Sequence, residues 1–241
     1  IKSISEKGLL YKGYTVQPYS PAAGSGLSSH ELNQPGAYKQ ISDTSVIAQF
    51  KCVEDDTSNK FNSLYPFYFL AWTTTPWTLP SNTALTVGAK IEYSFIKTFN
   101  QYTKEKTTVV VASSLIEKVF AKNFFIVKHE DELETFQESD SKIPYCVITS
   151  CKGIDIENLK YERVWDESPL PIDNPENAFR VILGDFVTTE DGTGIVHTAP
   201  TFGADDYKAA KSATPEVPPL QVLDSNGNKV PLVDLKGKFI D

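Results

Sequence analysis

Short apolar runs that are rich in β-branched and aromatic residues recur through the middle of the chain, and they most constrain its fold. FYFLAWTTT at residues 67–75 has strand length and stops where Pro76 would interrupt a ladder. The runs at 91–99 and 107–114 flank a polar loop, which predicts a hairpin. Further strands are predicted at 124–129, 145–150 and 180–189.

Helical patterns are few. Residues 114–123 have apolar positions on one helical face, with Ser113 or Ser114 as the expected N-cap. Residues 204–213 carry acids in the first turn and lysines in the last, which suits a helix dipole. Several strands with only a few helices predict an α/β domain of mixed strands.

The composition divides the chain into three zones. Residues 1–45 are rich in Gly, Pro, Ser and Asn, which predicts an extended tether or β-ribbon. Residues 46–214 carry the predicted core. Residues 215–241 predict a second, returning tether, in which Asn226 and Gly227 form a hairpin turn.

Composition also limits the possible functions. With 241 residues, of which 40% are hydrophobic and 22% charged, the chain is typical of a soluble globular protein. It has no apolar run of transmembrane length and no signal peptide, so we expect a cytoplasmic protein without a membrane partner. The net charge of −8 argues against an independent grip on long nucleic acid, so an RNA partner would be held only by its end. Because the chain lacks methionine and begins at Ile1, we expect a fragment of a larger protein.

The chain offers little for a metal or a cofactor. Its cysteines and histidines are scattered and form no ligand pattern, and no nucleotide-binding signature is present. We therefore predict neither a metal nor a cofactor.

Two stretches carry the chemistry: WTTTPWTLPSN at 72–82 and GTGIVHTAPTFGADDY at 192–207. Taken separately, each has an ordinary structural explanation. The first suits a strand that enters a Pro-rich turn, while His197 suits a satisfied histidine and the acids suit a helix start.

Together, the two stretches resemble the signature regions of the editing domain inserted in isoleucyl-tRNA synthetase, of the class I aminoacyl-tRNA synthetase family. The leucine and valine types usually have Thr-Thr-Arg-Pro followed by an acid, and they lack the histidine. Here Thr75 to Thr78 and His197 favour the isoleucine type. The resemblance covers nearly the whole chain and includes ribbons at 11–27, 30–39 and 230–240.

The resemblance implies a β-barrel-like core with surrounding helices and a tether at each end, inserted into a catalytic domain that this chain lacks. It implies hydrolysis of valine from the 3′ end of mischarged tRNA(Ile), and leaves open whether valyl-adenylate is cleared too. The partners would be that tRNA end, valine or valyl-adenylate as a small ligand, and the rest of the synthetase.

The resemblance and the residue types together predict the site. The predicted catalytic residues are Thr73, Thr74, Thr75, His197 and Asp206, and the predicted substrate-binding residues are Trp77, Thr78, Asn82, His197, Asp205 and Asp206. A carboxylate suits the substrate's ammonium, and the resemblance assigns this role to the second acid of the pair. The threonines would hold the ester, the ribose and an attacking water, without a covalent intermediate.

The sequence leaves two possible roles open for each of three site residues. His197 is interpreted either as a wall that excludes isoleucine or as a general base. Trp77 either walls the pocket or belongs to the core, to which Trp72 is assigned. Asn82 orients the turn or a substrate hydroxyl.

The sequence leaves three other functions open. They are editing for a leucyl- or valyl-tRNA synthetase, a non-catalytic module that binds the aminoacyl-tRNA end, and an unrelated threonine-dependent hydrolase.

Overall fold

The computed structural model describes residues 1–10, 16–20, 22–42, 44–166, 170–171 and 173–230, and the chain divides into two compact units, Ile1–Ile41 and Ser42–Leu232. The first unit contains a two-stranded antiparallel ribbon and two short helices. Ser28 and Glu31 form a capping box at the start of the second helix. Its elements are α1 (Lys2–Glu6), β1 (Tyr19–Ser20), β2 (Ser25–Gly26) and α2 (Ser29–Leu32). The sequence predicted a ribbon here but neither helix, and the boundaries at 45 and 214 stay predictions.

The second unit carries most of the regular structure. Its strands are β3 (Val46–Lys51), β4 (Phe67–Thr73), β5 (Ala84–Val87), β6 (Glu92–Phe99), β7 (Lys106–Ala112), β8 (Phe124–Ile126), β9 (Ile143–Lys152), β10 (Arg180–Leu183), β11 (Ile195–Thr198), β12 (Val222–Leu223) and β13 (Lys229–Val230). Its α-helices are α3 (Ile116–Val119) and α4 (Ala204–Ser212), and its 3₁₀ turns are η1 (Asp56–Leu64), η2 (Pro76–Ser81), η3 (Ser113–Leu115), η4 (Glu130–Thr135), η5 (Gly153–Asp155) and η6 (Pro175–Asn177).

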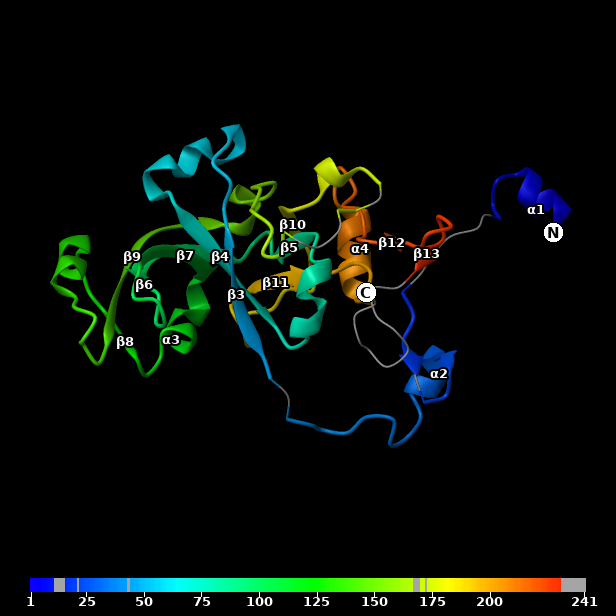
Figure 1. The fold of residues 1–241 in the computed structure, drawn as a ribbon, viewed down its shortest axis with the longest axis horizontal. Coiled ribbons are helices and arrows are strands. Elements are labelled where there is room, and N and C mark those ends of the chain that lie inside the picture. Colours follow the sequence, from blue (N-terminus) through cyan, green and yellow to red (C-terminus); the bar gives the residue numbers. More distant parts are fainter. Residues whose placement is uncertain (11–15, 21, 43, 167–169, 172, 231–241) are drawn as a thin grey trace. The chain divides into compact units, whose positions relative to one another are not determined.

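A nine-stranded mixed sheet organises this unit, in the order β10-β5-β11-β4-β7-β6-β9-β8, with β3 also paired to β4 (Figure 1). Strand β4 is the branch point because it pairs antiparallel with β3 and parallel with both β7 and β11. Strands β6 and β7 form the predicted hairpin, with Phe95 opposite Val110.

Backbone hydrogen bonds close one half of this sheet into a barrel. Beyond the end of β3, the amide of Val53 donates to the carbonyl of Lys160 at 2.8 Å, and Cys52 bridges to Tyr161. The same segment then pairs with β10, since Val181 N donates to Leu159 O at 2.8 Å. The ring therefore runs from β3 through β4, β11, β5 and β10 to residues 158–162 and back. The α/β class with a β-barrel-like core is confirmed.

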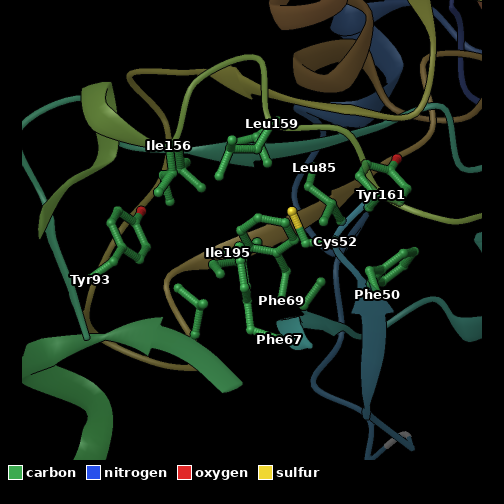
Figure 2. Packing of buried hydrophobic residues seen from close by; sticks show 14 of the residues in the cluster. Phe50, Cys52, Phe67, Phe69, Leu85, Tyr93, Ile156, Leu159, Tyr161 and Ile195 are labelled. Carbon is green, nitrogen blue, oxygen red and sulfur yellow. The ribbon is translucent and has the colours of Figure 1, made fainter. Parts of the chain in front are cut away.

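The barrel is filled by one apolar cluster (Figure 2). Most of the side chains that Figure 2 labels come from β3, β4, β5 and β11 or from the closing segment, while Tyr93 comes from β6 and Ile156 follows η5: Phe50, Cys52, Phe67, Phe69, Leu85, Tyr93, Ile156, Leu159, Tyr161 and Ile195. Complete burial of one large apolar side chain stabilises a fold by about 1.5–3 kcal/mol, so this cluster makes the barrel a rigid frame.

Three predicted elements are shorter than expected. The helix predicted at 114–123 is reduced to α3, without a serine cap: its predicted start belongs to the 3₁₀ turn η3, and it ends at Val119, before Lys122 adopts φ 52°. The strand predicted at 180–189 ends at Leu183, and the one predicted at 124–129 ends at Ile126.

The C-terminal hairpin is confirmed. Strands β12 and β13 pair antiparallel, and Gly227 adopts φ 80°, the left-handed conformation that such a turn requires. Most of the returning ribbon predicted at 230–240 lies outside the described residues, as do residues 11–15 and 21 of the first ribbon. Within the described part, no helix is long and apolar enough to cross a membrane.

Candidate functional site

A cavity of about 440 Å³ lies where β4 and β11 end. Because these neighbouring strands are parallel, with Trp72 opposite Val196, their carboxyl ends reach the same edge of the barrel. The turn η2 follows β4, and helix α4 follows β11. The cavity is lined by Trp72, Thr73, Thr74, Thr75, Trp77, Thr78, Val196, His197, Phe202, Gly203 and Asp206. Two stretches about 110 residues apart therefore form one site.

Threonine hydroxyls form a row along one side of the cavity. Thr73 Oγ1 accepts from the amide of Thr75 at 3.0 Å, and the hydroxyls of these two residues are 3.3 Å apart. The next hydroxyl, of Thr78, is 3.3 Å from that of Thr75 and donates to the carbonyl of Thr75 at 2.8 Å. Thr74 is exposed and its hydroxyl has no protein partner among the described residues, so it is available to a ligand or water.

His197 lies at the end of this row and is almost completely buried, with 5% of its surface exposed. Its Nε2 is 3.0 Å from Thr78 Oγ1, and its Nδ1 is 2.8 Å from Asn82 Nδ2. Burial lowers the pKa of His197 from 6.5 to about 4, because the charged imidazolium is poorly solvated there. The ring is therefore neutral at neutral pH, and both its nitrogens are engaged.

Asp206 supplies the carboxylate of the cavity from the first turn of α4. Its Oδ2 accepts from the amide of Ala199 at 2.9 Å, which ties the helix to the end of β11. Burial raises the pKa of Asp206, and the Ala199 hydrogen bond opposes that shift. A cation placed in the cavity would favour the ionised carboxylate and so bind more strongly than at the surface.

Gly203 makes this position of Asp206 possible. A Cβ added at Gly203 would lie 2.7 Å from Asp206 Cγ, closer than non-bonded carbon atoms approach. The glycine that precedes α4 is therefore required for the carboxylate and not for the turn, since its φ of −115° suits any residue.

The two tryptophans both line the cavity. Trp77 is 52% exposed, so its placement fits a pocket wall and not the core. Trp72 is only half-buried and also faces the cavity, so its assignment to the core is wrong.

Two of the predicted substrate-binding residues are not brought to the cavity. Asp205 points to a different hollow, where its carboxylate is 4.0 Å from Lys208 Nζ and its side chain is 70% exposed. Asn82 is buried behind His197 and contacts that ring instead of lining the cavity. Substrate contacts by these two residues stay predictions.

The side chains that line a second hollow make it a weaker candidate for the functional site than the cavity at the ends of β4 and β11. A second hollow of about 350 Å³ lies over β3, β4 and β7 and is lined mainly by apolar and amide side chains, among them Phe99, Phe120 and Asn100. It has neither a carboxylate nor an imidazole. In the described part of the chain, no three His, Cys, Asp or Glu residues are grouped to hold a metal ion.

Tyr161 was not predicted to contribute to the site. Its hydroxyl donates to Asn82 Oδ1 at 2.5 Å from inside the barrel, although it belongs to an irregular segment. No local sequence signal marks this residue, because it reaches Asn82 only through the closure of the barrel. Gly203 and Phe202 were quoted within the second stretch but were given no role.

The fold and the cavity define a class of ligand-binding site. A closed mixed barrel carries a small cavity, and the carboxylate and hydroxyls of this cavity suit a cationic ligand with polar oxygens. The chain is similar to curated isoleucine–tRNA ligases. It is 53% identical over 240 residues to that of Bacteroides fragilis, 52% over 241 to that of Cytophaga hutchinsonii and 39% over 257 to that of Treponema denticola. At least 99% of this chain is aligned in each case, and it spans about 20% of the length of these relatives. The chain is thus homologous to one segment of isoleucine–tRNA ligases.

Solved structures resemble the fold more distantly. GlLeuRS-CP1 has a TM-score of 0.48 at 14% identity, covering 70% of this chain and 59% of that chain. The editing domain of the cytosolic leucyl-tRNA synthetase of P. knowlesi has a TM-score of 0.47 at 14% identity, covering 68% and 60%. No protein-family model matches the chain.

Proposed function

We propose that this chain is the editing domain of an isoleucine–tRNA ligase and hydrolyses the ester between valine and the 3′ end of tRNA(Ile). The observation that carries the proposal is the meeting of Asp206, the threonine row and His197 in one cavity of about 440 Å³. Each of the three supplies something that selective hydrolysis of an aminoacyl ester requires.

Asp206 would bind the α-ammonium of the aminoacyl group. An ionised carboxylate accepting from an ammonium makes a strong, charge-assisted hydrogen bond. The hydrogen bond from the Ala199 amide holds the carboxylate in place before the substrate arrives, so the Asp206 side chain loses little conformational entropy on binding. A free amino acid and an aminoacyl ester would both be recognised through this group.

The threonines would position the ester and the water that attacks it. Thr74 and Thr75 line the same cavity as the Asp206 carboxylate. The Thr75 hydroxyl is held by Thr73 and Thr78, whereas that of Thr74 is available to a ligand. Such hydroxyls can orient water and stabilise the oxyanion that develops as the ester carbonyl is attacked. The reaction is acyl transfer to water and requires no cofactor.

His197 would set the size limit. A methylene adds only about 0.8 kcal/mol of binding when buried, so a pocket built on attraction cannot separate valine from isoleucine well. A rigid wall rejects the larger side chain by clash. The buried imidazole, fixed through both of its nitrogens, is such a wall.

One observation favours a different reaction. Thr78 Oγ1 is 3.0 Å from His197 Nε2, the separation expected of a nucleophile and its base. A threonine-dependent hydrolase built on this pair would form an acyl-threonine, which rapid quenching after mixing with substrate would trap. Direct attack by water forms no such adduct.

The partners follow from the reaction. The chain would hold the terminal nucleotide and its amino acid, while the remainder of the synthetase holds the body of the tRNA. A net charge of −8 suits this division because it gives the chain little attraction for a phosphate backbone. The site of action would be the cytoplasm, and valyl-adenylate would be a second ligand for the same cavity.

The test is deacylation of valyl-tRNA(Ile) by catalytic amounts of the chain. The proposal predicts release of free valine over several turnovers. A module that only binds the tRNA end would release no valine above the spontaneous rate. Parallel reactions with mischarged tRNA(Leu) and tRNA(Val) report whether the editing belongs to another synthetase, and hydrolysis of those substrates alone would contradict the assignment.

A further inference from the structure

Thr78, His197 and Asn82 lie in a row that has the spacing of a catalytic triad, with 3.0 Å between the first two and 2.8 Å between the last two. In such a triad the third residue accepts a hydrogen bond from the imidazole Nδ1–H and leaves the lone pair of the other ring nitrogen free to act as a base. Here the directions of the hydrogen bonds decide whether the row can work in that way.

The amide of Asn82 is oriented by three groups besides the imidazole, of which the most distant is the carbonyl of Thr198, 3.5 Å from Nδ2. Its Nδ2 donates to the carbonyl of Ala84 at 2.8 Å, which a carbonyl oxygen in that position could not do. Its Oδ1 accepts from the hydroxyl of Tyr161 at 2.5 Å. Burial holds the pKa of Tyr161 well above its ordinary value, so this hydroxyl keeps the proton that it donates.

The orientation of Asn82 fixes the proton on His197. Since Nδ2 of Asn82 faces Nδ1 of His197, Nδ1 must accept and carries no proton. In the neutral ring the proton is then on Nε2, which donates to Thr78 Oγ1. The Thr78 hydroxyl in turn donates to the carbonyl of Thr75 at 2.8 Å.

We propose that Tyr161 is a positioning residue that acts through Asn82 to hold His197 in its Nε2–H tautomer. The row therefore has the polarity opposite to that of a triad. His197 cannot take a proton from Thr78 because its Nε2 already has one, and its Nδ1 lone pair is occupied. The same network makes the ring a fixed wall. The consequence for amino-acid selection rests on the proposed function, whereas the tautomer does not.

Tyr161 suits this role because the barrel core holds it rigidly. It is 2% exposed, and its ring packs edge-on against Phe50 with centroids 5.2 Å apart (Figure 2). This fixed hydroxyl donates to Oδ1 of Asn82 while the carbonyl of Ala84 accepts from Nδ2, and together they favour one amide orientation. The barrel closure, which brings residue 161 beside β3, is thereby connected to the chemistry of the cavity.

The test combines nitrogen NMR of the histidine rings with deacylation assays on Tyr161→Phe, in the intact chain. The parent is expected to show His197 protonated on Nε2 and unprotonated on Nδ1, a signal identified by its loss in His197→Asn. In Tyr161→Phe the Oδ1 of Asn82 loses its hydrogen-bond donor, so the Nδ1–H form of His197 should become detectable. Asn82→Asp should invert the tautomer, because a carboxylate accepts from Nδ1–H.

The matched control is Tyr65→Phe. Tyr65 also donates a short hydrogen bond, 2.6 Å to the carbonyl of Val53, but it has no contact with Asn82. Both phenylalanine variants should lose similar stability, whereas only Tyr161→Phe should change the His197 signals. The rate of isoleucyl-tRNA hydrolysis relative to valyl-tRNA should rise by about threefold to tenfold in Tyr161→Phe, the equivalent of one lost hydrogen bond, and stay constant in Tyr65→Phe.

An Nδ1–H signal in the parent would overturn the proposal, and so would unchanged His197 signals in both Tyr161→Phe and Asn82→Asp. If the parent releases no valine while the tautomer results are as expected, the proposed function fails and the positioning role stands.

Discussion

Replacing Asp206 by asparagine separates the chemistry of the cavity from its architecture. Asparagine has nearly the same volume, and its Oδ1 can still accept from the amide of Ala199, which now lies 2.9 Å from the carboxylate. The substitution removes the charge and replaces the second carboxylate oxygen by an NH₂ donor. A substrate ammonium would then be left in a partly desolvated cavity without its main partner.

The magnitude follows from that loss. Removing one side of a buried, hydrogen-bonded charge pair costs about 2–5 kcal/mol. Valine release from valyl-tRNA(Ile), measured as kcat/KM, should therefore fall by about thirtyfold to several-thousandfold in Asp206→Asn.

The stability of Asp206→Asn, unlike its activity, should not fall. Because burial raises the pKa of Asp206, the folded state binds this proton more tightly than the unfolded state does. The resulting stabilisation is present below the unfolded pKa and is lost as pH rises through the folded pKa, so at neutral pH the ionised group opposes folding. Asp206→Asn should keep or increase the free energy of unfolding at pH 7, measured with urea.

Asp205→Asn is the matched control on the same helix, since that side chain is exposed and lies away from the cavity. It should lower kcat/KM far less than Asp206→Asn does and change stability little. Hydrolysis within a few-fold of the parent in Asp206→Asn, or a large loss in Asp205→Asn instead, would refute the role assigned to Asp206.

Three further predictions concern the groups around this carboxylate. Gly203→Ala should reduce valine release about as much as loss of Asp206, because its Cβ would displace that side chain, and circular dichroism should report an intact fold. Thr74→Val and Thr75→Val should slow hydrolysis in single-turnover assays with little change in melting temperature, since valine keeps the shape and β-propensity of threonine. Lower stability with unchanged rates would mean that these threonines only build the turn. The buried neutral His197, whose pKa is lowered to about 4, should stabilise the fold above pH 6.5 and lose that contribution as pH falls towards 4, by about 3 kcal/mol in all. Urea unfolding across this range should show the loss in the parent and not in His197→Asn.

The elements that are governed by local patterns were predictable from the sequence. The β6–β7 hairpin, helix α4 with its acidic first turn, and the Asn226–Gly227 turn follow from residue periodicity and turn chemistry, and the structure confirms them. The two chemical stretches also meet in one cavity, as the resemblance implied.

Long-range contacts were not predictable in the same way. The placement of Tyr161 depends on hydrogen bonds between residues 158–162 and both β3 and β10, which no local pattern encodes. The close packing of Gly203 on Asp206 and the direction of Asp205 likewise depend on how α4 docks at the end of β11. The helix at 114–123 was predicted too long because its start is the 3₁₀ turn η3 and the chain leaves the helix at Phe120, neither of which the apolar spacing signals.

The most direct test of the central claim is a pair of deacylation time courses, with valyl- and isoleucyl-tRNA(Ile), for the parent and His197→Ala. A neutral, fixed imidazole at His197 would exclude isoleucine by size and transfer no proton. The parent should hydrolyse the valyl ester and spare the isoleucyl ester, whereas His197→Ala should keep substantial valine release and gain isoleucine release. A variant that loses valine release and still spares isoleucine would contradict the account, because that is the behaviour of an enzyme that has lost its general base.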